Sequence, residues 1–220
     1  MNQAFLHHTP DGFCVESVTA TAVAAALGTP CYVYSAGAIR DAYQRLDAAF
    51  GARRHAIHYA LKANSTLAVV RLMRSLGSRV DANSMGEVDV ALRCGFAARD
   101  IVFTGVGKSA DELDRAVALG LLAINVESPG ELERLDRVAL ARGTVARVAI
   151  RVNPDIDAQS HPHISTGLRT NKFGVPIDLA RGLYRDIARH RGLQAVGVHV
   201  HIGSQITTLD PLRRAAGRAW

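Results

Sequence analysis

Short apolar strands alternate with amphipathic helices along most of this sequence, from residue 56 to residue 201. The strands are predicted at residues 56–62, 79–83, 100–104, 121–127, 147–153 and 194–201. The helices between them are predicted at residues 67–76, 85–94, 110–119, 129–142 and 177–190. A strand and a helix that recur at intervals of roughly twenty-odd residues are typical of βα units, whose strands form one parallel sheet.

The residues before this series predict a smaller arrangement. Residues 10–16 read as a turn and a short strand, followed by a helix at 17–27 that Ser17 caps and Gly28 ends. Another strand is predicted at 31–34, and an amphipathic helix at 35–50. We therefore expect a strand and helix segment over residues 1–34 and a main domain over residues 35–220.

The two faces of the predicted strands differ in polarity. One face is apolar throughout and includes Ile57, Tyr59, Leu61, Leu122 and Val196. The other face is small or polar, and its polar members lie at or near the carboxyl ends of the strands. A doubly wound sheet meets helices on both faces, whereas a barrel has one face toward a ring of helices and one toward a narrow interior. The pattern predicts an α/β fold of the (β/α)8 TIM-like barrel type, with six strands present.

Four ionisable residues lie at strand ends on the polar face, namely Lys62, Asp81, Arg151 and His201. The carboxyl ends of barrel strands surround a single mouth, so we expect these four to converge. Each has an ordinary explanation when taken alone: a surface lysine, a capping aspartate, an ion-paired arginine or a buried histidine. Four ionisable residues that all lie at strand ends on the same face of the sheet favour a shared site.

A lysine at a barrel mouth can be a counter-charge, a general base or a Schiff-base amine. Burial and neighbouring cations favour the third use, because they disfavour the ammonium form. Gly203 and Ser204 follow the last strand, and their backbone N–H groups and hydroxyl suit a phosphate. An aldehyde cofactor that carries a phosphate would use Lys62, this turn and Arg151, with His201 stacked on its ring.

The amino-acid composition indicates which kinds of molecule the protein can bind. The net charge of +6 comes from scattered arginines and the aromatic content is 5%, which makes a nucleic-acid surface a weak interpretation and anionic small molecules a better one. Three cysteines without CxxC spacing indicate reduced, buried thiols in a cytoplasm. No stretch reaches the roughly 20 apolar residues of a membrane span. We expect a soluble cytoplasmic protein with no membrane or nucleic-acid partner.

A set of motifs matches a known family. In chain order they are HYALKANS, DANSMGEVDVAL, IVFTGVGKS, NVESPGEL, RVNPD, HPHISTGLRTNKFG and VHVHIGSQ. Together they closely resemble the bacterial diaminopimelate decarboxylases, which are similar to ornithine and arginine decarboxylases and to alanine racemase, all enzymes that use pyridoxal 5'-phosphate on an α/β barrel. The resemblance runs from about residue 29 to about residue 211.

The resemblance implies a role for each matching residue. Lys62 matches the lysine that binds the cofactor covalently, and His201 matches the histidine stacked on the cofactor ring. The phosphate-side turn corresponds to Gly203 and Ser204. Polar residues beside the cofactor correspond to Asp81, Glu87 and Arg151, whereas Lys172 matches a lysine near the subunit interface of a homodimer. The implied reaction is decarboxylation of meso-diaminopimelate to L-lysine, in lysine biosynthesis.

The chain departs from the family pattern in two places. Ala82, Asn83 and Met85 stand where the family more often reads DVVSGGE, although Asp81 and Glu87 remain. Family members also continue with a glycine-rich phosphate loop, further substrate and cofactor residues, and a C-terminal β-domain. Six strands of the eight that a barrel needs are present here. The sequence therefore predicts an N-terminal portion of a decarboxylase, or a truncated product, without that β-domain.

Other interpretations stay open. A decarboxylase for ornithine, arginine or lysine, or a non-catalytic protein that holds pyridoxal phosphate, would use the same residues. The segment from Gly105 to Ala110 fits GxGxxA after a strand, with Glu127 at a suitable distance for an NAD-dependent oxidoreductase. His199 and His201 form an HxH pair typical of a metal-dependent barrel hydrolase, with His161 and His163 nearby in the sequence. We expect no metal site.

Overall fold

The computed structural model describes residues 5–156 and 173–219. Its main sheet holds seven parallel strands, six of them in one continuous order. That order is β10 (Leu193–Val200), β8 (Ala146–Asn153), β7 (Ala123–Val126), β6 (Ile101–Phe103), β5 (Arg79–Ala82) and β4 (His58–Ala60), and the short β9 (Val175–Pro176) pairs with β8. Each of the six predicted strands is confirmed, with ends that differ from the prediction by at most two residues.

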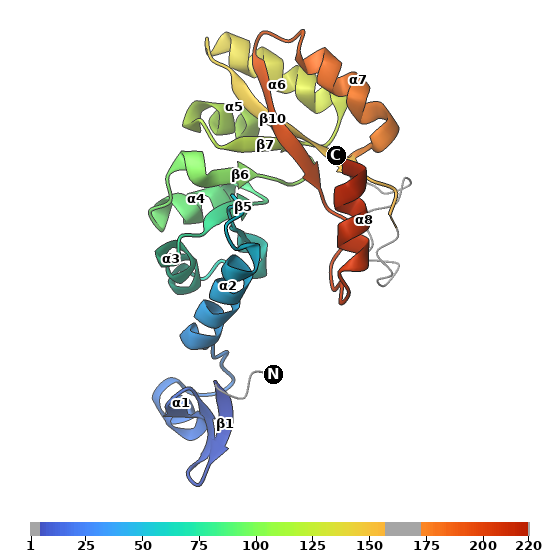
Figure 1. Ribbon diagram of the computed structural model, residues 1–220. Helices are drawn as coiled ribbons and strands as arrows, with labels where there is room; N and C mark the ends of the chain where they lie inside the picture. The colour runs from blue at the N-terminus through green and yellow to red at the C-terminus, as the bar shows by residue number, and fades with distance from the viewer. Residues whose placement is uncertain (1–4, 157–172, 220) are drawn as a thin grey trace.

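Helices connect the strands and lie along one side of the sheet (Figure 1). They are α3 (Leu67–Ser75), α4 (Met85–Arg93), α5 (Ala110–Leu119), α6 (Pro129–Ala141) and α7 (Ile177–Ile187). Ser84, Ser109 and Ser128 cap α4, α5 and α6, each accepting a hydrogen bond from the backbone N–H three residues later. Because the serine precedes an amphipathic run each time, these helix starts follow directly from the sequence.

One hydrophobic core lies between the outer face of the sheet and these helices. Strand residues such as Val80, Ile101 and Val148 are fully buried there against helix residues such as Leu113 and Leu135. The opposite face is small and polar and opens onto a cavity of about 450 Å³. Helices on one face and a cavity on the other make this a partial α/β barrel, as the strand faces predicted.

Three residues depart from the predicted assignment of faces. Leu122, Val196 and Val198, expected on the outer face, line the inner cavity. Leu122 lies just before β7 begins, outside the regular alternation. The register between β10 and β8 shifts between Ala195 and Gly197, so Val196 is the extra residue of a β-bulge and its side chain is 38% exposed. A bulge of this kind gives no signal in the apolar pattern.

The N-terminal segment forms a separate three-stranded antiparallel sheet at one end of the molecule (Figure 1). Its elements are β1 (Leu6–Thr9), β2 (Gly12–Val15), β3 (Val18–Thr19) and the helix α1 (Ala20–Leu27). Thr19 rather than Ser17 caps α1, because residues 18 and 19 pair with β2 before the helix begins. Gly28 ends α1 as predicted.

The strand predicted at residues 31–34 is wrong. These residues have no regular structure and are exposed, since they cross from the N-terminal sheet to α2 (Ala36–Phe50) without a strand beside them. Ser35 caps α2 as expected, and the Glu16 carboxylate accepts hydrogen bonds from the Ser35 hydroxyl at 2.6 Å and from Gly37 N–H at 2.7 Å. Glu16 thereby ties the N-terminal sheet to the start of α2.

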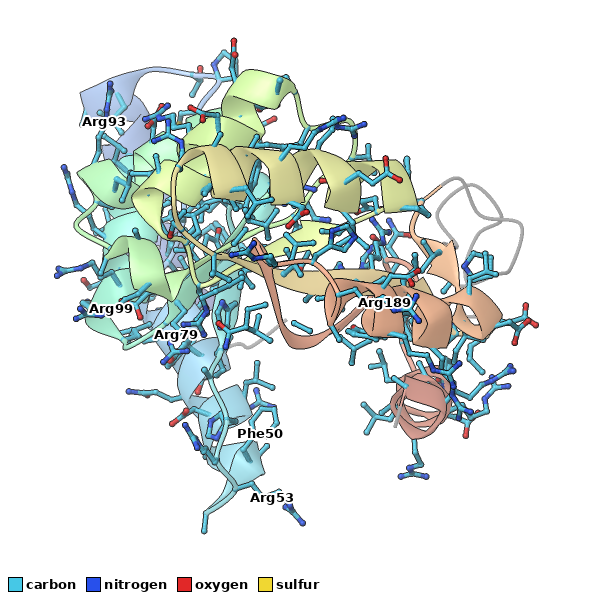
Figure 2. The ribbon with its side chains drawn as sticks, turned by 90° about the horizontal axis from the view of Figure 1, so that it is seen from above. Phe50, Arg53, Arg79, Arg93, Arg99 and Arg189 are labelled. Atoms are coloured by element: carbon cyan, nitrogen blue, oxygen red, sulfur yellow. The ribbon has the colours of Figure 1, made fainter. Side chains whose placement is uncertain are left out.

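The exposure of residues 31–34 also corrects the prediction of three buried cysteines. All three thiols are free, and Cys14 and Cys94 are buried, but Cys31 is exposed. The positive charge is scattered as predicted: Arg93, Arg99 and Arg189 lie on different parts of the molecule (Figure 2). Among the helices described, none has the length and apolar content needed to cross a membrane.

Candidate active site

Lys62 lies just after β4, in a single turn of 3-10 helix, Leu61–Ala63. Leu61 is fully buried on the core side, which leaves Lys62 exposed on the opposite side. The next residues are held in place, because the Tyr59 hydroxyl donates to the Asn64 carbonyl at 3.0 Å. The sequence predicted Lys62 as the last residue of the strand; the structure places it two residues beyond the strand, still at its carboxyl end.

Asp81 lies on β5, faces the inner cavity and is oriented by its neighbours. The Thr104 hydroxyl, which follows β6, donates to Asp81 Oδ1. Thr104 in turn accepts a hydrogen bond at 2.8 Å from the side-chain amide of Asn125 on β7. A row of three polar side chains thus crosses three neighbouring strands and ends on the Asp81 carboxylate.

Arg151 lies on β8 and forms a buried ion pair with Glu127. Its Nη1 donates to Glu127 Oε1 at 3.0 Å, and both side chains are more than nine-tenths buried. The guanidinium carbon lies 5.4 Å from the centre of the Phe173 ring, a cation–π contact. A side chain at Gly174 (φ +74°) would meet the Arg151 carbonyl oxygen at 2.9 Å, so glycine is required where this loop approaches the strand.

The pKa of His201 responds to the charges of three other predicted site residues. Burial lowers the pKa of His201, the charges of Arg151 and Lys62 lower it further, and the charge of Asp81 opposes them. His199 is more deeply affected: burial, with Arg151 and other cations, lowers its pKa to about 4. Both rings are therefore neutral at pH 7. The charges of Arg151, Lys62 and Asp81 all act on His201, as a shared site would require, and the role of these four residues in a cofactor site stays a prediction.

Gly203 and Ser204 lie beyond β10 in an irregular turn. Gly203 has φ +135°, and Gln205 has φ +57°. Ile202 anchors the turn, since it is buried in a small second core with Ile156 and with Ala215 of α8 (Asp210–Ala219). The Ser204 hydroxyl is exposed beside this anchored backbone. The turn consequently offers backbone N–H groups and a hydroxyl at the carboxyl end of the sheet.

Glu87 makes its side-chain contact with the backbone at the start of α4. Its Oε2 accepts a hydrogen bond from Asn83 N–H at 2.8 Å, and Ser84 Oγ accepts from Glu87 N–H at 3.2 Å. Glu131 has the matching position in α6, where it binds Glu127 N–H at 3.0 Å. The contact of Glu87 supports the helix start, and its predicted contact with a cofactor stays a prediction.

Several buried polar atoms at this end of the sheet have no hydrogen-bond partner among the described residues. They are Asn83 Nδ2, Glu127 Oε2, Arg151 Nε, Asn153 Oδ1 and His199 Nδ1. Buried polar atoms in native proteins are normally paired, so an unpaired group of them calls for a ligand or water. The set contains both donors and acceptors, and the charge of Lys62 acts on one of its members, His199. These residues fit a polar, anionic aldehyde such as pyridoxal phosphate.

A comparison with family models decides the family. Residues 36–220 match the model described as "Pyridoxal-dependent decarboxylase, pyridoxal binding domain". The chain belongs to the pyridoxal-dependent decarboxylase family. The matched range begins with α2 and includes every strand of the main sheet, so the partial barrel is the pyridoxal-binding domain of this family.

Curated and solved members of the family resemble the chain over most of its length. Diaminopimelate decarboxylase of Pseudomonas aeruginosa is 45% identical over 203 residues, which cover 92% of this chain and 49% of that protein. The Campylobacter jejuni protein of the same name is 46% identical over 188 residues, 86% of this chain and 47% of its own. The chain therefore spans about half the length of the curated relatives it matches.

Solved structures agree. The diaminopimelate decarboxylase of Helicobacter pylori, complexed with L-lysine, superposes with a TM-score of 0.83 at 44% identity, over 86% of this chain and 48% of that one. The M. jannaschii diaminopimelate decarboxylase in co-complex with L-lysine gives a TM-score of 0.88 at 32% identity, over 97% of this chain and 51% of that one. The barrel type predicted from the sequence is confirmed.

The decarboxylase fold also explains the segment that resembled a nucleotide loop. Gly105 (φ +106°) is required because a side chain there would meet the Asn83 carbonyl oxygen at 2.5 Å. Lys108 is buried against Glu131, and Glu127 pairs with Arg151 rather than facing open space. The fit to GxGxxA therefore reflects close packing of neighbouring loops.

Sequence reasoning did not identify the buried ion pair of Lys108 and Glu131. Glu131 is the third residue after Ser128, which is the pattern of an ordinary helix start, so its sequence position gave no signal of a second role. Of the earlier candidates, His161, His163 and Lys172 lie outside the described residues. Within the described ranges, no three His, Cys, Asp or Glu side chains are grouped to hold a metal ion.

Proposed function

We propose that this chain is the cofactor-binding part of a carboxy-lyase that decarboxylates meso-diaminopimelate to L-lysine. The observation that carries the proposal is the meeting of Lys62, Asp81 and Arg151 around His201 at the carboxyl end of the sheet. Relatives named diaminopimelate decarboxylase at 43–46% identity support the choice of substrate. We also propose that the protein works in the cytoplasm and, with the remainder of its family's length, as a homodimer.

Each residue has a role that follows from its surroundings. Lys62 supplies the amine that binds the aldehyde carbon of pyridoxal phosphate, and its exposure leaves it free to reach that carbon. His201 is neutral at pH 7, so its flat ring can stack on the cofactor without adding a charge beside Lys62. When bound, the cofactor accepts the electron pair that remains on the substrate α-carbon after carbon dioxide leaves.

Arg151 and Asp81 position the cofactor and substrate and take no part in bond making or breaking. Arg151 is held by Glu127 and keeps one donor, Nε, unpaired among the described residues for an oxygen of the cofactor or substrate. Asp81 is fixed by Thr104 and faces the same space, where it balances the two cations. The Gly203 and Ser204 turn holds the phosphate through its N–H groups and hydroxyl.

The first test is covalent capture of the cofactor. The chain is mixed with pyridoxal phosphate, reduced with borohydride, digested and mapped. The sequence has three lysines, Lys62, Lys108 and Lys172, which makes the assignment unambiguous. We expect the adduct on Lys62, its loss in Lys62→Ala and its retention in Lys172→Ala. An adduct that is absent, or that persists in Lys62→Ala, contradicts the proposal.

The second test concerns the substrate. The chain is combined with the C-terminal half of a diaminopimelate decarboxylase, and release of carbon dioxide is measured with diaminopimelate, lysine, ornithine and arginine. We expect release with diaminopimelate, since a lysine decarboxylase structure matches at only 25% identity. Preference for another amino acid would move the proposal to that substrate, and cofactor capture without turnover of any would indicate a pyridoxal-phosphate-binding protein.

A further inference from the structure

We propose that Lys108 is a positioning residue that holds both the carboxylate of Asp81 and the guanidinium of Arg151 through two chains of hydrogen bonds. This inference rests on the proposed function and adds a residue that makes no contact with the cofactor. Lys108 lies in the loop between β6 and α5, in the segment that resembled a nucleotide loop.

The surroundings of Lys108 leave it no freedom to act on a ligand. Its side chain is 2% exposed, and Nζ donates at 2.7 Å to each of three acceptors: the Gly105 carbonyl, the Asn125 carbonyl and Glu131 Oε1. An ammonium has three donors, so all are used, and Glu131 balances its charge. A buried cation bonded in this way acts by fixing its partners.

The first chain runs from Lys108 to Asp81. Lys108 holds the backbone of Asn125, whose side-chain amide donates to Thr104 Oγ1 at 2.8 Å. Thr104 has one hydroxyl proton, and because its oxygen already accepts from Asn125, the proton points to Asp81 Oδ1. The orientation of the Asp81 carboxylate is thereby set from β7.

The second chain runs from Lys108 to Arg151. One oxygen of Glu131 binds Lys108, and the other accepts from Glu127 N–H at 3.0 Å. Glu127 Oε1 then accepts from Arg151 Nη1 at 3.0 Å. The two chains share Lys108 and end on charges of opposite sign that both act on His201. One lysine therefore sets the balance of charge at the mouth.

The test uses two variants and a matched control. Lys108→Met combined with Glu131→Gln removes the buried pair together, so that no buried charge is left alone. Thr104→Val cuts only the chain to Asp81. Arg115→Met is the control, because Arg115 lies on α5, the helix that follows Lys108, and its loss breaks only an exposed ion pair with Asp89. Folding of each variant is checked by circular dichroism.

The first readout is capture of pyridoxal phosphate on Lys62 as a function of its concentration. We expect capture to become about tenfold weaker in the double variant and in Thr104→Val, the size of one lost hydrogen bond to a charged group. Arg115→Met is expected to behave as the unmodified chain. Equal capture by the double variant and the control would overturn the inference.

The second readout is the titration of His201, followed by NMR without cofactor. Loss of the Lys108 pair loosens both Arg151 and Asp81, and because the charge of Arg151 acts more strongly on His201, the His201 pKa should rise toward its ordinary value. Thr104→Val loosens Asp81 alone and should lower the His201 pKa. An unchanged titration in Thr104→Val refutes the inference even if the double variant does not fold. If the unmodified chain captured no cofactor, the proposed function would fail while this titration still decided the inference.

Discussion

His199 and His201 are two residues apart on one strand end, and both are kept neutral by burial and by nearby cations. For His199 the folded state has a pKa of about 4, against an ordinary value of 6.5. The unfolded chain therefore takes up a proton first as the pH falls. The contribution of the neutral His199 ring to folding stability is fully present above about pH 6.5, and it is lost as the pH falls toward 4.

The predicted result is a free energy of unfolding that decreases by about 1 kcal/mol per pH unit between pH 6 and pH 4 because of His199. Urea unfolding at a series of pH values measures it. His199→Gln, which has no proton to gain, should show a shallower decrease. An identical pH dependence in the two proteins would mean that His199 titrates normally in the folded state.

A second prediction at this scale concerns the buried pair of Glu127 and Arg151. Glu127→Ala leaves the arginine buried without its carboxylate, and we expect the free energy of unfolding to fall by about 3 kcal/mol. Asp114→Ala breaks the ion pair with Arg142, which is exposed to solvent, and should change stability little. Chemical denaturation compares them, and equal losses would contradict the contrast.

At the scale of elements, the outer helices are joined by a series of similar contacts. Asp89 on α4 binds Arg115 on α5, and Asp114 on α5 binds Arg142 at the end of α6. Asp136 on α6 then binds His190, after α7. The first two sequence separations, 26 and 28 residues, match one βα repeat, and the third is 54 residues because the connection between β8 and α7 is longer. Each helix is thereby fixed to the next around the sheet.

The last of these contacts gives a prediction for glycines. A side chain at Gly192 would meet the Asp136 carbonyl oxygen at 2.8 Å, so Gly192→Ala should destabilise the protein by about 2 kcal/mol. Gly182, inside α7, has open space around it, and Gly182→Ala should stabilise by about 0.5–1 kcal/mol through higher helix propensity. Thermal unfolding distinguishes them; the same sign for both would refute the packing argument.

For the whole molecule, burial is unevenly distributed. The core lies under β5 to β8, whereas α1 and α2 contain no buried residue. The N-terminal sheet lies at one end of the molecule (Figure 1), where Glu16 accepts hydrogen bonds from Ser35 and Gly37 at the start of α2. Segments with few buried contacts open more often than the core.

We therefore predict two rates of amide hydrogen exchange. Strands β5 to β8 should be strongly protected, and the amides of residues 5–50 should exchange much faster, as measured by mass spectrometry. Glu16→Gln, which weakens the link to Ser35 and Gly37, should raise exchange at the start of α2 without changing the central strands. Uniform protection along the chain would contradict this division.

The sequence by itself determined the βα series, the starts of α4, α5 and α6 and the general difference in polarity between the two sheet faces. These features depend on local periodicity and capping, which neighbouring residues encode. Tertiary structure alone decided the hydrogen bonds that Lys108, Thr104 and Glu131 form. It also decided the β-bulge at Val196 and the irregular segment at residues 31–34. Those depend on the register between strands and on packing between loops some twenty residues apart, which no local pattern records.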